Sequence, residues 1–132
     1  MLTQGAIEAI SHHGTENQKK EYLPKLLTGE WSGTMNLTEP QAGSDVGALN
    51  TSAKKNSDGS YSIKGTKIYI TYGDHDMAEN IIHLVLARID GAPEGNNGIS
   101  LFIVPKFIKN QKSNELEKND LQCIGLENKL GI

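Results

Sequence analysis

The hydrophobic periodicity of the chain changes at Trp31, and this change limits which folds are possible. Before Trp31, apolar residues recur at helical spacing, from Leu2 to Ile10 and again from Tyr22 to Leu27. After Trp31, apolar and polar residues alternate in short runs separated by Gly, Pro, Asn and Asp, as in strands joined by turns. The chain is therefore expected to begin with helices and to continue as a β-domain.

Local signals mark where the two helices end. Gly14 follows the first helix, expected over residues 2 to 12, as a stop signal. Thr15 and Gln18 have the spacing of a capping box, which opens the second helix. Pro24 lacks an N–H donor and is expected to kink or restart that helix.

The β-domain is expected to contain several short strands joined by turns. The expected strands are Thr34–Thr38, Leu49–Lys54, Ser60–Lys64, Lys67–Thr71, Ile81–Ile89, Ile99–Val104 and Leu121–Leu126. Asp58-Gly59 between two of these runs is typical of a hairpin, and the polar residues 109–119 are expected to form a mobile loop. The predicted fold class is α+β: a short N-terminal helical segment followed by an antiparallel β-barrel or sandwich.

Composition and charge exclude several functions. The 132 residues suit one domain, and a formal charge of −3 gives no electrostatic reason to expect a nucleic-acid partner. The longest apolar run, residues 81–87, is far shorter than the roughly 20 residues of a membrane span. The single cysteine, Cys123, excludes a disulfide within one copy, and we expect it to be buried and inert. A low cysteine count fits a reducing, cytoplasmic compartment. Asp74-His75-Asp76 is expected to be a solvated turn rather than a metal site.

The run from Asn36 to Ala48, which reads NLTEPQAGSDVGA, is the most informative part of the chain. It resembles the acyl-CoA dehydrogenase signature: an aliphatic residue, Thr or Ser, Glu, two variable positions, a small residue, Gly, Ser or Thr, Asp, two more positions and a small residue. Every one of these positions is matched from Leu37 onward, while Asn36 stands where the family usually has a smaller or apolar residue.

Three further runs carry the same resemblance in the right order. Gly65–Gly73 is similar to the family's strand Gly-x-Lys-x-aromatic-Ile-Thr-Asn-Gly, with Tyr69 where Trp or Phe is usual and Tyr72 where Asn is usual. Gly14–Leu27 resembles the helix before the family's β-domain, and Gly98–Pro105 resembles one of its later strands.

The resemblance implies a domain organisation and a cofactor. Residues 1–30 would be the end of the N-terminal helical domain, and residues 31–132 the flavin-binding middle β-domain, truncated at its C-terminus. Residues 67–80 resemble the branch that contains methylmercaptopropionyl-CoA and some long-chain acyl-CoA dehydrogenases. The cofactor implied is FAD, and the residues implied to bind it are Met35, Leu37, Thr38, Gly43, Ser44, Tyr69 and Thr71.

Each implied role has a physical rationale and an alternative. Thr38 would meet the flavin pyrimidine edge beside backbone groups of Met35 and Leu37, while Thr71 would lie near flavin N5 and Tyr69 would pack on the ring. Gly43 and Ser44 would meet the pyrophosphate, because glycine lets the backbone approach and N–H and hydroxyl groups donate. The alternatives are ordinary strand threonines, core packing of Tyr69 and a plain turn, with Asp45 capping its own backbone and Asp45 and Glu39 holding the loop.

The function implied is α,β-dehydrogenation of an acyl-CoA thioester, with electrons passing to an electron-transfer flavoprotein. In the family the base is a glutamate of a later helical bundle, so no catalytic residue is named here and the chain alone is expected to be inactive. Exposed strand edges would favour self-association. One alternative is a non-catalytic β-domain that acts as a protein-interaction module or as a subunit of a split enzyme. Another is an FMN-binding barrel like the flavin reductases, which lack the signature of residues 38–45.

Overall fold

The computed structural model describes residues 1–110, 113 and 115–130. The chain divides into two compact units. The first contains residues 1–35, 71–84 and 103–132, and the second contains residues 36–70 and 85–102. Each unit is treated by itself below.

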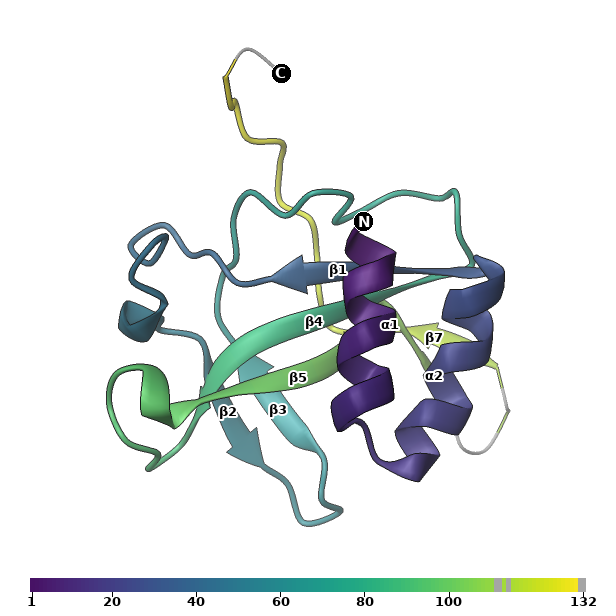
Figure 1. Cartoon of the computed structure of the whole chain (residues 1–132), viewed down its shortest axis with the longest axis horizontal. Coiled ribbons are helices and arrows are strands. Elements are labelled where there is room, and N and C mark those ends of the chain that lie inside the picture. Colours follow the sequence, from purple (N-terminus) through teal and green to yellow (C-terminus); the bar gives the residue numbers. More distant parts are fainter. Residues whose placement is uncertain (111–112, 114, 131–132) are drawn as a thin grey trace. The chain divides into compact units, whose positions relative to one another are not determined.

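The first unit opens with two capped helices, α1 (Leu2–His13) and α2 (Glu16–Thr28), which lie side by side (Figure 1). Thr15 and Gln18 form the predicted capping box, with Gln18 N donating to Thr15 Oγ1 over 3.3 Å and Thr15 N donating to Gln18 Oε1 over 2.8 Å. Helix α2 ends at Gly29, whose φ of +80° favours glycine. The predicted restart at Pro24 is wrong, since α2 runs through it as one element between its two capped ends.

The core of the first unit lies where the helices meet the strands. It is formed by six buried residues: Ala6, Ile10, Leu26, Trp31, Ile82 and Leu84. A Cβ on Gly33 would lie 2.6 Å from the Cβ of Ala6, so glycine in β1 is what lets α1 pack this closely. The amide of Gly33 also donates to Thr3 Oγ1 over 3.1 Å, which ties α1 to the strand.

The strands pair into a sheet that is mixed rather than wholly antiparallel. Its elements are β1 (Trp31–Asn36), β2 (Ser52–Lys55), β3 (Tyr61–Lys64), β4 (Asn80–Ile89) and β5 (Ile99–Pro105). In the hydrogen-bonded order β1, β2 and β5 all neighbour β4, and β3 follows β2. Within the second unit β2 pairs with β4 in parallel, with Ser52 opposite Arg88 and Ala53 opposite Ile89. Helices followed by a β-domain are as predicted, but this one pairing is not antiparallel.

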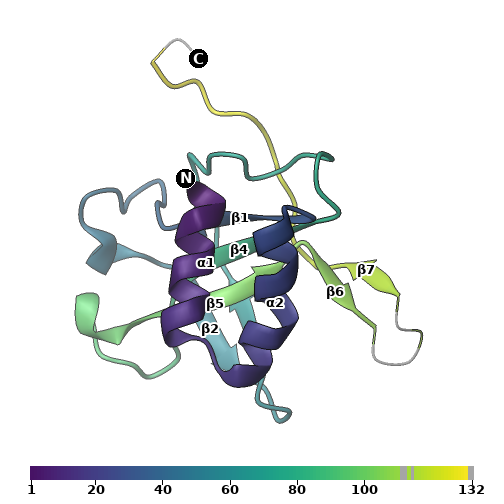
Figure 2. The same ribbon diagram turned by 45° about the vertical axis from the view of Figure 1, so that its right-hand side comes forward.

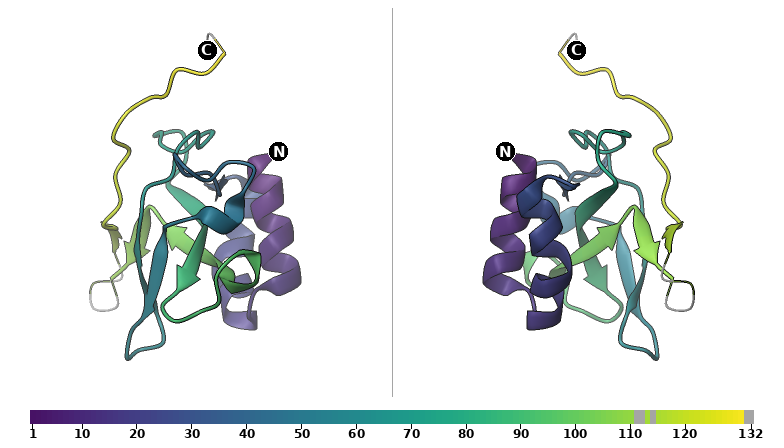
Figure 3. Two further views of the ribbon diagram at one scale, coloured as in Figure 1. Left: turned by 90° about the vertical axis from the view of Figure 1, so that its left-hand side faces the viewer. Right: turned by 90° about the vertical axis from the view of Figure 1, so that its right-hand side faces the viewer.

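The predicted hairpin at Asp58-Gly59 is confirmed. Strands β2 and β3 are antiparallel, with Ala53 opposite Ile63. Gly59 has φ of +86°, and the amide of Ser60 donates to Asp58 Oδ1 over 2.9 Å. The two strands of this hairpin can be followed side by side in both views of Figure 3.

The first unit contains a second hairpin where a loop was expected. Strands β6 (Phe107–Lys109) and β7 (Leu116–Lys118) pair antiparallel, with Ile108 opposite Glu117 (Figure 2). The expectation of a loop over 109–119 is thus wrong at both ends, while residues 111, 112 and 114 lie outside the described residues. Strands of only three residues are too short to show an alternation of apolar and polar side chains, which is why the sequence did not predict them.

Three other expectations are wrong in the remaining segments. Lys67–Thr71 is not a strand, because Tyr69 has φ of +56°, which no extended backbone allows. Residues 121–126 form no strand either, and Cys123 is exposed rather than buried. Across the described part of the chain, none of the helices has the length and apolar character needed to cross a membrane.

Candidate functional site

The signature segment of the second unit folds into a closed turn, which exposed residues follow. Glu39 and Ala42 exchange backbone hydrogen bonds of 3.0 Å in both directions, which closes the turn around Pro40 and Gln41. Ala42 is fully buried beneath it. The next two residues, Gly43 and Ser44, are exposed, and they precede the short 3₁₀ helix η1 (Val46–Ala48).

Gly43 has no reason within the fold to be glycine. Its φ lies outside the left-handed region, and a Cβ built on it would meet nothing within 4 Å. Gly47, four residues on, is different, because its Cβ would lie 2.9 Å from Asn96 Oδ1 and 3.1 Å from Asp45 Oδ1. The open face of Gly43 is therefore available for close approach by another molecule.

Glu39 anchors this turn from beneath. Its carboxylate is 3% exposed and accepts five hydrogen bonds, from Gln41 Nε2, Asn50 N, Thr51 N, Thr51 Oγ1 and Lys67 Nζ. Burial alone would raise the pKa of Glu39, but these donors outweigh it and lower the pKa to about 2. Glu39 is thus a permanent carboxylate that holds the loop, as the sequence predicted. For Asp45 the expected cap is absent, since its side chain makes no capping hydrogen bond at η1.

Lys67 joins a second predicted segment to the same anchor. Its ammonium lies 2.8 Å from Glu39 Oε1 and donates to the carbonyl of Leu37 over 3.2 Å. One residue on, the amide of Ile68 donates to the carbonyl of Thr38 over 3.0 Å. The structure therefore brings Leu37 and Thr38 against residues 67–68, with Tyr69 next in the chain and 45% exposed.

Arg88 is a part of this region that sequence reasoning missed. Its guanidinium donates to the carbonyls of Gly47 and Gly95, each over 2.9 Å, and to that of Pro93. It thereby ties η1 to residues 93–95. The only sequence signal was a charged residue inside an otherwise apolar strand, which is also what a solvent-facing position looks like.

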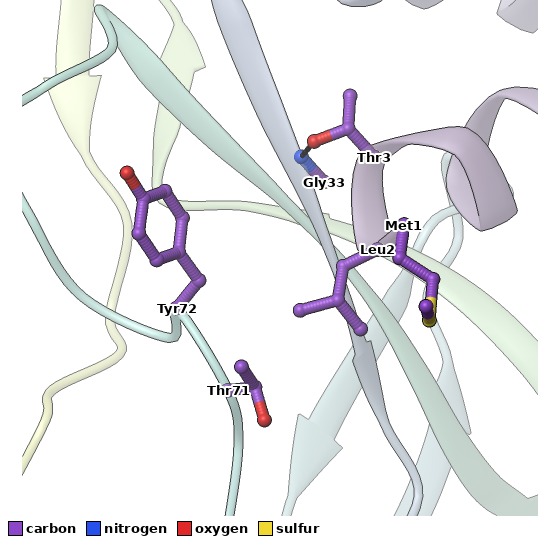
Figure 4. A pocket seen from close by; sticks show the side chains of 6 residues that line it. All are labelled: Met1, Leu2, Thr3, Gly33, Thr71 and Tyr72. Carbon is purple, nitrogen blue, oxygen red and sulfur yellow. Dashed lines mark hydrogen bonds between the residues drawn. The ribbon is translucent and has the colours of Figure 1, made fainter.

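Two predicted residues, Met35 and Thr71, belong to the first unit. Met35 packs against the core of that unit near the end of β1, where its side chain is half-buried. Thr71 is exposed and lines a cavity of about 420 Å³ (Figure 4). The other residues lining this cavity are Met1, Leu2, Thr3, Gly33 and Tyr72. The lining is largely apolar and includes no carboxylate.

Tyr72 forms one wall of this cavity in an unusual conformation. Its φ of +60° is one that tyrosine rarely adopts. Its ring centroid lies 4.2 Å from that of His75, and its hydroxyl donates to Met77 Sδ over 3.4 Å. These two contacts hold the ring in place beside Thr71.

The polar cluster that follows Gly73 supplies neither a nucleophile nor a metal site. Ser32 Oγ lies 3.1 Å from His75 Nε2, and the amide of Met77 donates to His75 Nδ1. Because Nδ1 accepts that bond, the neutral ring carries its proton on Nε2 and cannot take one from Ser32. Asp74 is paired with Lys106 over 2.6 Å, and the described residues contain no group of three metal-ligating side chains.

Three of the seven predicted flavin-binding residues carry a hydroxyl that the fold leaves uncommitted. The hydroxyls of Thr38, Ser44 and Thr71 have no hydrogen-bond partner among the described residues, whereas those of Thr34 and Thr51 are committed to His83 and Glu39. Five of the seven predicted residues lie in the second unit, where the Glu39 anchor holds the segments that carry them. Uncommitted hydroxyls and an open glycine face fit an anionic, hydrogen-bonding cofactor such as FAD.

Comparisons with known proteins show to which family the chain belongs. The acyl-CoA dehydrogenase middle-domain model matches residues 34–124, and the N-terminal-domain model of the same family matches residues 1–30. The chain is 55% identical over its whole length to 3-methylmercaptopropionyl-CoA dehydrogenase of Ruegeria pomeroyi, and it spans 22% of that protein.

Solved structures give the same result. Butyryl-CoA dehydrogenase from Megasphaera elsdenii is 39% identical with a TM-score of 0.60, over 74% of this chain and 24% of that one. An acyl-CoA dehydrogenase from Bacillus anthracis, solved in complex with FAD, is 41% identical with a TM-score of 0.58, over 70% of this chain and 14% of that one. The resemblance found in the signature is confirmed, and the chain belongs to the acyl-CoA dehydrogenase family.

Proposed function

We propose that this chain forms the flavin-contacting part of an FAD-dependent acyl-CoA dehydrogenase. The observation that carries the proposal is the exposed turn at Gly43 and Ser44, where a glycine that the fold does not need leaves an open face. Backbone amides and a free hydroxyl at such a turn are the donors that a pyrophosphate requires. In the proposed assignment residues 1–30 end a helical domain and residues 31–132 form the flavin-binding domain.

The proposed roles follow from the hydroxyl, backbone or ring groups of each residue that the fold leaves available to a ligand. The uncommitted hydroxyl of Thr38 and the backbone groups of Met35 and Leu37 would hold the pyrimidine edge of the flavin. Tyr69 would pack its exposed ring on the isoalloxazine. The hydroxyl of Thr71 would donate beside N5, the atom through which bound flavin accepts hydride.

The cavity beside Thr71 supports an apolar acyl chain as the substrate group. The hollow is open to solvent, and Met1, Leu2 and Tyr72 contribute apolar surface to it. None of the lining residues carries a carboxylate, so the base that removes the α-proton would come from other residues. We therefore propose that the chain alone binds flavin without turning over acyl-CoA.

The proposed partners are an acyl-CoA, an electron-transfer flavoprotein and a second copy of the chain. Self-association is supported by apolar side chains near the end of the chain, where Ile124, Leu126 and Leu130 are 86%, 99% and 94% exposed. The same surface favours the second candidate function, a protein-interaction module or a subunit of a split enzyme. That alternative predicts binding of a protein partner without any affinity for FAD.

Titration with FAD, followed by the quenching of flavin fluorescence, separates the two. We expect binding by the wild-type chain and a tenfold or greater loss of affinity in Thr38→Val and Thr71→Val. Thr66→Val is the matched control, because Thr66 is exposed like Thr71 and its hydroxyl has no hydrogen bond among the described residues, but it has no proposed role. Equal affinity in all three variants would contradict the proposed site, and no binding by the wild type would favour the interaction module.

A further inference from the structure

The buried ion pair between Glu39 and Lys67 stands directly behind the proposed flavin-contacting backbone of the second unit. The side chains are 2% and 8% exposed, and their charged atoms lie 2.8 Å apart. The two residues are 28 positions apart in sequence, so the pair joins segments that local structure does not hold together.

The bonds around this pair form a short ladder. Lys67 donates to the carbonyl of Leu37 over 3.2 Å, and the amide of Ile68 donates to the carbonyl of Thr38 over 3.0 Å. The carboxylate of Glu39 accepts the next hydrogen bond from Lys67, and it also accepts hydrogen bonds from the amides of Asn50 and Thr51. Three consecutive residues of the signature, 37 to 39, are thus each bonded to residue 67 or 68.

Stability alone is a poor explanation for this pair. Taking two charges out of water costs about as much as their attraction returns, and apolar side chains of similar volume often serve as well. A buried pair does fix geometry, since a misplaced partner leaves an unpaired charge in the interior. Neither group is free for chemistry, because Glu39 accepts five donors and two donors of Lys67 are already used.

We propose that Glu39 and Lys67 are positioning residues that hold the backbone of Leu37 and Thr38 in register with Ile68, and so set the groups that meet the flavin ring. Only the part of this inference that concerns the flavin ring rests on the proposed function. The register of the two segments can be measured without any cofactor.

The test compares Lys67→Met with Lys67→Arg and with the double variant Glu39→Gln/Lys67→Met. The first leaves a buried unpaired carboxylate, the second keeps the cation, and the third leaves no charge unpaired. Lys64→Met is the matched control, since Lys64 is an exposed lysine at the end of β3. Three readouts are taken from each variant: the exchange rates of single amides, the resistance to unfolding by urea and the affinity for FAD.

Amide exchange reports on the register. The amide of Ile68 bonds to Thr38, while the amide of Asp90 bonds to Ala53 elsewhere in the same unit and serves as the reference. In Lys67→Met and in the double variant we expect exchange at Ile68 to rise at least tenfold relative to Asp90, with partial rescue in Lys67→Arg and no change in Lys64→Met. If Ile68 and Asp90 accelerate together, the pair stabilises the unit as a whole and the proposal is wrong.

The affinity for FAD reports on the proposed site. The double variant shows whether a loss of affinity comes from a misplaced backbone or only from lower stability. We expect its resistance to urea to recover toward that of the wild type while its FAD affinity stays at least tenfold lower, a separation that a purely stabilising pair would not produce. Recovery of both would overturn the proposal. A wild-type chain that fails to bind FAD would contradict the proposed function, and the exchange rates would still decide whether the pair sets the register.

Discussion

The buried histidine of β4 predicts a measurable loss of stability in mild acid. Burial lowers the pKa of His83 from 6.5 to about 4, and its ring is only 4% exposed beside Thr34. As the pH falls below 6.5, the unfolded chain takes up a proton at His83 that the folded chain does not accept until about pH 4. The stability from neutral His83 is therefore complete above pH 6.5 and is lost as the pH falls from 6.5 to 4.

The size of this loss follows from the two pKa values. Linkage between 6.5 and about 4 gives a decrease in the free energy of unfolding of about 2 kcal/mol between pH 7 and pH 5. The buried carboxyl group of Glu39 titrates in a lower pH range. Its pKa is about 2 in the folded chain against an ordinary 4.5, so its contribution to the free energy of unfolding is lost only as the pH falls from 4.5 to 2. The range from pH 7 to pH 5 therefore isolates His83 from Glu39.

Urea unfolding at pH 7, 6 and 5 measures the effect, with fluorescence of the single tryptophan, Trp31, as the probe. The wild type should lose about 2 kcal/mol over this range, and His83→Leu should lose much less, whatever its stability at pH 7. His13→Gln is the control, because His13 is exposed at the end of α1 and should leave the slope unchanged. A wild-type stability that stays level from pH 7 to pH 5, or a slope that survives in His83→Leu, would refute this reasoning.

Two glycine substitutions are expected to have opposite effects. In Gly43→Ala the new methyl group meets nothing, so the free energy of unfolding should stay equal or rise by up to about 1 kcal/mol. The affinity for FAD should nevertheless fall at least tenfold in the fluorescence titration. An unchanged affinity would show that Gly43 is not part of the site. In Gly98→Ala the methyl group would collide with the carbonyl of Pro93 and the guanidinium of Arg88, which should destabilise the chain by about 1–3 kcal/mol in urea unfolding. A Gly98→Ala variant as stable as the wild type would show that residues 93–98 pack less tightly than the structure indicates.

Elements with a strong local signal were predictable from the sequence. The capping box at Thr15 and the hairpin turn at Asp58-Gly59 depend on contacts within a few residues, so a short window of sequence contains their cause. The long strand β4 was predictable for another reason, because its own run of apolar residues is long enough to be recognised. The strand expected over Lys67–Thr71 shows the limit of that reasoning. Its alternation is correct for a strand, but the left-handed backbone at Tyr69 interrupts it, and alternation says nothing about φ.

The candidate site also contains residues that the sequence could identify and residues that it could not. Six of its seven residues could be named from the signature and from the run Gly65–Gly73, because a family motif records residue types in order, and the seventh, Met35, directly precedes the signature run. Their neighbours could not. Arg88 had no motif to identify it, and the partner of Glu39 is 28 residues away at Lys67.

The sequence by itself determined which residue types are present, where the helices are capped and to which family the chain belongs, since these depend on local order along the chain. Only the tertiary structure decided which groups are committed and which are free. Thr51 and Thr38 are the same residue type near the same turn, yet Thr51 is bound to Glu39 while the hydroxyl of Thr38 has no partner among the described residues. That difference arises from contacts between distant segments, whose geometry no local pattern encodes.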